Sequence, residues 1–495
     1  MGQFYRILVF FPILSVVLLS GCEKTEADDE VDMGWTTGKE YIMDPGADYE
    51  HSYVQINPDN PHYFRLSNGE PYIPVGCNIA YARDYQTLKD YLKKLADNGG
   101  NFARIWMSRE YLDHETEYGK VNETSVANMK ELIQYAGELG LKIKFCLEEF
   151  RYIESTSVNG PTKTAYHVLN GGPFSSMEDF MLTRPELGKQ VYLDKVNFIK
   201  QNYGDDPRVF AWELWNEMNA ISVGQEQVNE WTAEILLDLV DIFKRNMVTQ
   251  SLGSYDGDWQ VQFYRAVPAM RGNDVIQVHR YLDEGADYPV CYGPVDEMAA
   301  DAVRTMLDMN YGKPVILAES GAVAPKHSGK HEAYAKDHAG IILHDVLFAP
   351  FFSGAAGPGH CWHWDEYIDA NGLWYHFRKF SDVVKELDPA AENFVPIRAD
   401  NDILKIYVLK GNDHTLLWCR DKNNSWQNEF NRGISPDVIS GSELDIAEIS
   451  GGKVPVSVEY YNPWEQVSAW TDLVLDGMTV SIPDFSRSIV LKITY

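Results

Sequence analysis

The sequence predicts an α/β fold, a (β/α)8 TIM barrel followed by a C-terminal all-β sandwich module. From Ile73 onward, short apolar runs alternate with longer stretches of helical periodicity, and eight such runs occur before Pro389. Beyond Pro389 the helical periodicity stops, and short alternating runs follow one another between turn residues. Strands that alternate with helices imply a parallel sheet, and eight such units suit a closed barrel.

The N-terminal residues 1–21 are expected to be a signal peptide and not part of the fold. Arg6 precedes an apolar run over residues 7–19, which is shorter than the roughly 20 residues of a membrane-spanning helix. The run ends in Leu19-Ser20-Gly21-Cys22, which resembles the lipobox of bacterial lipoproteins, where the Cys after the cleavage site receives a lipid. The resemblance implies lipidation of Cys22, and a plain signal peptide with a chance Cys is the alternative.

A linker is expected over residues 22–45, because this stretch is polar and has no hydrophobic periodicity. Its acidic start, residues 23–30, is similar to signals that send Bacteroidetes lipoproteins to the outer face of the cell. The expected location is therefore the bacterial outer membrane, with a lipid anchor and the folded part exposed at the cell surface.

The barrel is predicted over residues 46–388. It opens with a hairpin over residues 63–74, because Asn68-Gly69 suits a two-residue turn between apolar runs. The eight strands are predicted at residues 73–77, 102–107, 143–147, 209–215, 249–252, 275–278, 315–318 and 360–364. The clearest helical patterns lie at residues 85–98, 126–139, 189–202, 228–245 and 297–310.

The all-β module is predicted over residues 389–495. Short alternating runs separated by turns are typical of a sandwich of antiparallel sheets. Its strands are predicted at residues 403–409, 415–418, 456–461, 467–470, 479–482 and 488–493.

Composition excludes several classes of function. The chain has 43 Lys and Arg against 73 Asp and Glu, a formal net charge of −30, so no basic face is available for a nucleic acid. Six Cys without a CxxC spacing argue against a disulfide scaffold or a zinc ribbon. No Gly-rich phosphate loop and no HExxH motif occur, so neither a cofactor nor a metal is expected.

Polar and aromatic residues follow the predicted strands at the positions where barrel enzymes carry their chemistry. Glu217 follows the carboxyl end of the fourth strand, and Glu319 follows that of the seventh. The further candidates on the second, fourth, sixth and eighth strands are Arg104, Asn216, His279, Tyr281, Trp362 and Trp364.

This set resembles the retaining glycoside hydrolases of clan A, most closely glycoside hydrolase family 5, the cellulase and mannanase family, or an unassigned relative of it. The resemblance covers roughly residues 62 to 385 and implies that Glu217 is the acid/base and Glu319 the nucleophile. It also implies that Asn216 binds the sugar 2-hydroxyl, Arg104 and Tyr281 keep the nucleophile ionised, His279 lies near the acid/base, and Trp362 or Trp364 is the sugar platform.

One departure from family 5 lies after the third strand, where members commonly carry a His and this chain has Glu148 and Glu149. Either carboxylate is a candidate for a different polar contact with the sugar.

The chemistry of the two carboxyl groups agrees with the resemblance. Cleavage of a glycosidic bond by this route needs one protonated carboxyl and one carboxylate. Trp212 and Trp215 lie shortly before Glu217 in the sequence, and an apolar setting is expected to raise its pKa. The aromatic content of 13% also suits sugar binding, because sugar faces stack on Trp and Tyr.

The function predicted is that of a retaining β-glycosidase that cleaves a β-linked polysaccharide or oligosaccharide by double displacement. A catalytically inactive glycan-binding lipoprotein and a transglycosylase with the same carboxylates are the alternatives. The expected partners are a carbohydrate substrate and a lipid anchor. The sugar, endo or exo action and the oligomeric state stay open.

Overall fold

The computed structural model describes residue 39, residues 41–153 and residues 164–495. The predicted signal peptide (residues 1–21), the lipidation site Cys22 and most of the predicted linker lie outside the described residues. Within the described part of the chain, no helix combines the length and the apolar character that crossing a membrane requires.

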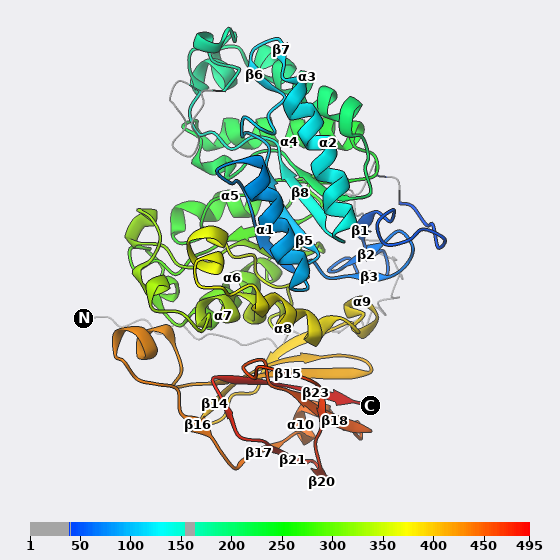
Figure 1. Ribbon diagram of the computed structural model, residues 1–495, viewed down its shortest axis with the longest axis vertical. Coiled ribbons are helices and arrows are strands. Elements are labelled where there is room, and N and C mark those ends of the chain that lie inside the picture. The colour runs from blue at the N-terminus through cyan, green and yellow to red at the C-terminus, as the bar shows by residue number, and fades with distance from the viewer. Residues whose placement is uncertain (1–38, 40, 154–163) are drawn as a thin grey trace, which may run out of the picture. The chain divides into compact units, whose positions relative to one another are not determined.

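Parallel strands alternate with helices through the larger part of the chain, as predicted (Figure 1). The strands are β4 (Gly76–Asn78), β5 (Phe102–Trp106), β8 (Lys142–Cys146), β9 (Val209–Glu213), β10 (Met247–Thr249), β11 (Ile276–His279) and β12 (Val315–Glu319). Five of them pair in the order β10-β9-β8-β5-β4, and β11 pairs with β12. Every pairing in these two sheets is parallel.

Most helices that cover these strands are amphipathic, whereas every residue of α7 (Ile341–Phe351) is buried. In α1 (Tyr85–Asp97), Asp84 caps the N-terminus by accepting from the amide of Thr87, and Leu88, Leu92 and Leu95 are buried. The others are α2 (Glu123–Glu138), α3 (Pro185–Tyr203), α4 (Gln225–Ile242), α5 (Val261–Ala266), α6 (Val295–Leu307), α7 (Ile341–Phe351), α8 (Tyr375–Val384) and the short α9 (Pro389–Glu392).

Antiparallel strands accompany the parallel ones. The predicted hairpin is present, with β2 (Phe64–Leu66) paired to β3 (Pro71–Tyr72), and Gly69 takes the positive φ of 99° that the turn needs. Strand β1 (Val54–Ile56) extends this sheet, and β6 (Glu115–Glu117) pairs with β7 (Lys120–Val121).

The predicted eighth strand is not a regular strand. Residues 360–364 contribute one isolated bridge, between Ser320 and Cys361, and a helical turn begins at Trp364. The assigned strands therefore do not form one closed sheet. Backbone bonds still join this segment to both neighbours, because His360 donates to Leu317 (2.9 Å) and Asn78 donates to the carbonyl of Cys361 (3.1 Å).

The predicted fifth strand is displaced. It was expected at residues 249–252, whereas β10 ends at Thr249. Side-chain amides take over the following backbone donors: Asn273 accepts from the amide of Gln250 (3.2 Å) and Asn219 from that of Gly253 (2.6 Å). At these two positions the backbone amides stay paired after the chain leaves the ladder.

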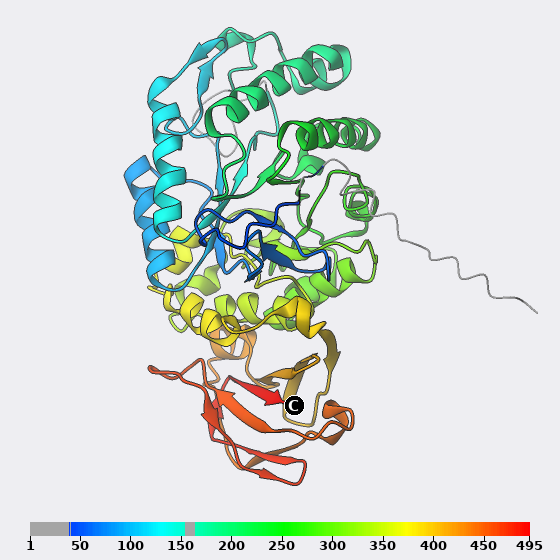
Figure 2. The same cartoon turned by 90° about the vertical axis from the view of Figure 1, so that its right-hand side faces the viewer.

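Residues from Val395 onward form antiparallel sheets, coloured dark yellow to red in Figure 2. One sheet has the order β13-β14-β15-β23-β18-β19 and another the order β17-β21-β20, and Leu404 and Ile406 of the first share a buried cluster with Val480 of the second. The predicted strand 467–470 is wrong, because pairing with β18 begins only at Thr471. The elements are β13 (Val395–Arg398), β14 (Leu404–Lys410), β15 (His414–Asp421), β16 (Val438–Ile439), β17 (Ser442–Asp445), α10 (Ala447–Ser450), β18 (Ser457–Tyr461), β19 (Thr471–Asp472), β20 (Leu475–Asp476), β21 (Thr479–Ile482), β22 (Phe485–Ser486) and β23 (Ser488–Thr494).

Polar contacts connect this region to the helices that precede it. Arg420 on β15 donates from Nε to Asp345 on α7 at 2.9 Å, and both side chains are buried. Trp426 donates from its indole to the carbonyl of Gly293 at 2.9 Å. Removal of Arg420 or Asp345 would leave an uncompensated buried charge, so this ion pair ties the module to α7.

Candidate active site

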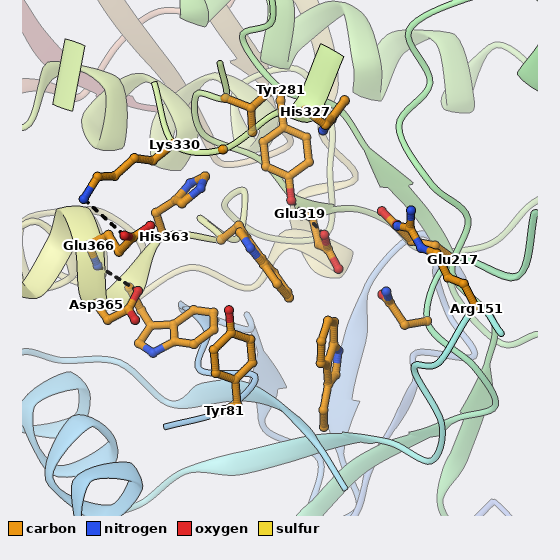
Figure 3. A pocket seen from close by; sticks show the side chains of 16 residues that line it. Tyr81, Arg151, Glu217, Tyr281, Glu319, His327, Lys330, His363, Asp365 and Glu366 are labelled. Carbon is orange, nitrogen blue, oxygen red and sulfur yellow. Dashed lines mark hydrogen bonds and ion pairs between the residues drawn. The ribbon is translucent and has the colours of Figure 1, made fainter. Parts of the chain in front are cut away.

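A cavity of about 490 Å³ lies among residues that follow the strands (Figure 3). Charged and aromatic side chains line it together, which is typical of a site for a polar ligand with apolar faces. Its lining includes Tyr81, Trp106, Arg151, Asn216, Glu217, Tyr281, Glu319, His327, Lys330, Trp362, His363, Trp364, Asp365 and Glu366.

Two donors hold Glu319, the last residue of β12. Arg104 on β5 donates from Nη1 to Oε1 at 2.5 Å, and the Tyr281 hydroxyl donates to Oε2 at 2.7 Å. Burial and the neighbouring Glu319 charge raise the pKa of Tyr281 well above its ordinary value, so the phenol keeps its proton and acts as a donor. The two hydrogen bonds together fix the orientation of the carboxyl group.

Arg104 is itself held by a buried network. It donates from Nε and Nη2 to Glu213 at 2.9 and 2.6 Å and from Nη2 to Asn216 at 2.8 Å, and its side chain is fully buried. Burial lowers the pKa of Arg104, but the charges of Glu213 and Glu319 outweigh burial and raise it. Lys144 adds a second cation beside Glu213 at 3.2 Å. The guanidinium therefore stays charged and oriented toward Glu319.

Glu217 lies beyond the end of β9 in a left-handed conformation, with φ 51° and ψ 57°. Its Oε1 lies 3.0 Å from Nδ1 of His279, and Arg151 donates from Nη2 to its Oε2 at 2.5 Å. A non-glycine residue in this backbone region is strained, and such strain is concentrated at functional sites.

The predicted rise in the pKa of Glu217 is wrong for this state of the protein. Burial raises the pKa of Glu217, but the hydrogen bond with His279 and the charge of Arg151 outweigh burial and bring it to about 2. The aromatic residues expected to act on it face elsewhere. Trp212 stacks on Phe243, and Trp215 donates to the carbonyl of Phe150 at 2.9 Å.

The two carboxyl groups are close together. One oxygen of Glu217, one oxygen of Glu319 and a ring nitrogen of His279 all lie within 4.8 Å of one another. The same nitrogen of His279 lies 3.0 Å from Glu217 and 3.4 Å from Glu319. Such a trio could bind a cation, but Arg104, Tyr281 and Arg151 already donate to its carboxylate oxygens.

The two candidate platform residues differ in exposure. Trp362 is half-buried, and its ring packs on Trp106 with a centroid distance of 5.0 Å. Trp364 is only 1% exposed and meets Trp362 and Tyr81 edge-on. Both residues line the cavity, and Trp362 is the more exposed of the two and therefore the better candidate for a sugar platform.

Sequence reasoning missed Arg151, which reaches the acid/base candidate from the segment that departs from family 5. Glu148 and Glu149, the residues considered there, have other partners: Glu148 accepts from Lys195 (2.7 Å) and the Tyr166 hydroxyl (2.8 Å), and Glu149 accepts from Ser108 (3.1 Å). The departure from family 5 in this segment indicated that its contacts with the site would differ. It did not indicate which side chain of the segment points into the cavity.

Replacing Arg151 by Gln is expected to move the alkaline limb of the pH profile of kcat/KM to higher pH. The guanidinium lowers the pKa of Glu217, so its loss lets Glu217 keep the proton that a general acid needs. The expected displacement is about 1 to 3 pH units, the range by which a neighbouring Arg lowers a carboxyl pKa. Arg151→Lys keeps the charge and serves as the control. An alkaline limb that stays in place in Arg151→Gln contradicts this role.

Comparisons with known proteins agree on one family. A family model described as Cellulase (glycosyl hydrolase family 5) matches residues 66–341. The chain is 23% identical over 398 residues to mannan endo-1,4-beta-mannosidase 7 of Arabidopsis thaliana, covering 72% of this chain and 84% of that protein.

Solved structures support the same fold. A glycoside hydrolase family 5 structure from Bacteroides vulgatus matches with a TM-score of 0.55 at 12% identity, over 92% of this chain and 95% of that one. A putative glycoside hydrolase from the same organism matches with a TM-score of 0.55 at 15% identity, over 90% and 83%. The predicted (β/α)8 barrel class is thereby confirmed, although the strands of this structure are not assigned as one closed sheet.

Proposed function

Because this chain belongs to glycosyl hydrolase family 5 and is a glycoside hydrolase, we propose that it cleaves a β-linked polysaccharide with retention of configuration. The observation that carries the proposal is the short separation of Glu217 and Glu319, within 4.8 Å between one oxygen of each. Retaining pairs lie about 5–5.5 Å apart, whereas inverting pairs need about 6.5–9.5 Å to admit a water.

Glu319 is the nucleophile in this proposal. Its carboxylate attacks the anomeric carbon, the bond to the leaving oxygen breaks, and Glu217 gives its proton to that oxygen. Arg104 and Tyr281 orient the attacking carboxylate through the bonds to its two oxygens. Trp362 holds the sugar ring by stacking, and Asn216 at the cavity wall binds the 2-hydroxyl.

In the second step Glu217 acts as a base. It takes a proton from a water, the water attacks the anomeric carbon, and Glu319 leaves as a carboxylate. Glu217 must be protonated for the first step, which Arg151 and His279 oppose in the free protein. Arg151 has a side chain 35% exposed to the cavity, so a sugar in the leaving-group position can displace it and restore the acid.

The similarity to plant mannan endo-1,4-beta-mannosidases supports β-mannan as the substrate. An assay on β-mannan, β-glucan, xylan and galactan, with product lengths measured, tests this choice. The expected result is release of mannose or manno-oligosaccharides at a rate at least about tenfold above the other polymers, since a lost sugar hydroxyl contact costs that much or more. A preference for another polymer overturns the mannan assignment but leaves the family intact. Products longer than the substrate would indicate transglycosylation.

We further propose that the mature protein is anchored to the outer membrane through lipidated Cys22, and the lipobox-like sequence supports this. Cys22→Ser is expected to move the protein from the membrane fraction to the soluble fraction with unchanged kcat/KM. The reason is that a bacterial lipoprotein Cys carries more than one acyl chain, enough for stable anchoring. Immunoblots of the two fractions make the measurement, with Ser20→Thr as the matched control. Retention of the Cys22→Ser protein in the membrane contradicts the proposal.

A further inference from the structure

We propose that Asp256, Asp283 and His327 form a binding site for a divalent transition-metal ion of the Zn²⁺ type beside the active-site cavity. One carboxylate oxygen of each Asp and Nε2 of His327 all lie within 4.8 Å of one another. Nε2 of His327 is 3.4 Å from Oδ2 of Asp256 and 3.6 Å from Oδ2 of Asp283. We call these three residues the loop triad, because they follow β10, β11 and β12 respectively.

Asp283 gives the observation that points to a ligand. Its side chain is only 2% exposed, and its Oδ1 accepts from the amides of Gly285 (2.7 Å) and Lys326 (2.9 Å). Its Oδ2 is buried and has no hydrogen-bond partner among the described residues. A buried carboxylate oxygen without a donor is costly, and here it faces the other two members of the loop triad.

The spacing fits metal–ligand geometry. Zn²⁺ binds His nitrogen at about 2.0–2.1 Å and carboxylate oxygen at about 2.0–2.2 Å, which at tetrahedral angles separates neighbouring ligand atoms by roughly 3.3–3.6 Å. The two separations from His327 are 3.4 and 3.6 Å. Ca²⁺ takes six to eight oxygens, and Mg²⁺ keeps a shell of waters. A set of one imidazole and two carboxylates therefore favours an ion between hard and soft in character, such as Zn²⁺. The fourth position is left for water.

The local charge also favours a cation. In the part of the chain that the structure describes, the ion pairs of Asp256 and Asp283 involve His327 and no Lys or Arg. A neutral imidazole would leave two carboxylates facing each other without compensation. The competing interpretation is an imidazolium that pairs with both carboxylates, and a Zn²⁺ titration distinguishes the two.

A bound ion would act on the active site through one aromatic contact. The His327 ring packs edge-on against Tyr281 with a centroid distance of 5.3 Å, and Tyr281 donates to Glu319 (Figure 3). Lys326 and His327 both adopt left-handed backbone conformations, with φ 61° and 55°. The ion would join three loops at the cavity wall and fix Tyr281 from behind.

No local spacing in the sequence could reveal the loop triad, because its members lie on three separate loops. The prediction that no metal is bound used only motifs of residues close together in the sequence. The fold is what brings positions 256, 283 and 327 close together.

Isothermal titration of Zn²⁺ into the chelator-treated full chain tests the proposal. The expected result is one saturable equivalent, an affinity at least about tenfold weaker in Asp283→Asn and His327→Gln, and an unchanged affinity in Asp258→Asn. Asp258 is an acidic neighbour that accepts from the Tyr288 hydroxyl and lies outside the loop triad, so it is the matched control. Zn²⁺ should also raise the Tm of the wild type but not that of His327→Gln.

His327 has a side chain 38% exposed, so the Gln variant is expected to fold even if Asp283→Asn does not. Co²⁺ in place of Zn²⁺ should give the visible absorption of a four-coordinate ion, lost in His327→Gln. Absence of saturable binding, equal affinity in the wild type and His327→Gln, or a preference for Ca²⁺ over Zn²⁺ would each overturn the assignment. The first of these outcomes would favour the imidazolium pair.

Discussion

Replacing Glu319 by Ala should lower kcat by at least about four orders of magnitude on every glycoside, whatever its leaving group. The substitution removes the carboxylate that forms the covalent bond, and among the residues that the structure describes no other carboxylate is held by both Arg104 and Tyr281. Initial rates with natural oligosaccharides and with dinitrophenyl glycosides give the measurement.

The control for this variant is Glu366→Gln. Glu366 also lines the cavity but pairs with Lys330 at 3.1 Å, away from Glu319, and Figure 3 shows that pair on the side of the cavity opposite Glu217. The Glu366→Gln substitution should lower kcat by less than about tenfold. Glu319→Ala is expected to fold, because Arg104 keeps Glu213 as a partner. The thermal transition of the variant checks this. A residual kcat within a hundredfold of the wild type would exclude Glu319 as the nucleophile.

Replacing Glu217 by Ala should affect substrates according to their leaving groups. Natural oligosaccharides need a proton on the departing oxygen, so their rate should fall by about 10²- to 10⁴-fold. Dinitrophenyl glycosides need little protonation, so their first step should survive and the glycosyl-enzyme should accumulate on Glu319. Added azide should then restore turnover, since it replaces the water that Glu217 activates.

The product of that rescue is equally informative. A β-glycosyl azide is expected, because azide attacks the intermediate from the face that the leaving group vacated. Glu332→Gln on the loop after β12 is a suitable control, since Glu332 is outside the cavity lining. The rate of this variant should not increase when azide is added. If azide leaves the rate of Glu217→Ala unchanged, or yields the α-azide, the acid/base role of Glu217 is wrong.

The sequence was sufficient for the fold class and for the position of the main polar residues. Strand ends in a parallel barrel meet at one face, so Arg104, Glu217, Tyr281 and Glu319 could be placed together from periodicity and order along the chain. The structure places Glu217, Tyr281 and Glu319 around one cavity, and the fully buried Arg104 reaches that group by donating to Glu319. Helices such as α1 were predictable because capping and apolar spacing are local properties.

The remaining features depend on contacts that no local pattern encodes. The pKa of Glu217 depends on Arg151, which lies 66 positions away in the sequence and approaches only in the folded chain. The nearness of Trp212 and Trp215 in the sequence predicted an apolar setting for Glu217, but the chain turns at a left-handed residue and the Trp215 ring packs in the core. The irregular eighth strand also depends on contacts between distant parts of the sequence. The backbone of residues 360–361 bonds with Asn78 and Leu317.

Trapping of the covalent intermediate tests the double-displacement mechanism most directly. Incubation with a 2-deoxy-2-fluoro-β-mannosyl fluoride, which slows both steps but the second more, should inactivate the protein with the mass of one fluorosugar added per chain. Peptide mapping should place that mass on the peptide that contains Glu319, and the label should be absent in Glu319→Ala. Turnover without any labelled chain, or a label on a different carboxylate, would contradict a covalent double displacement through Glu319.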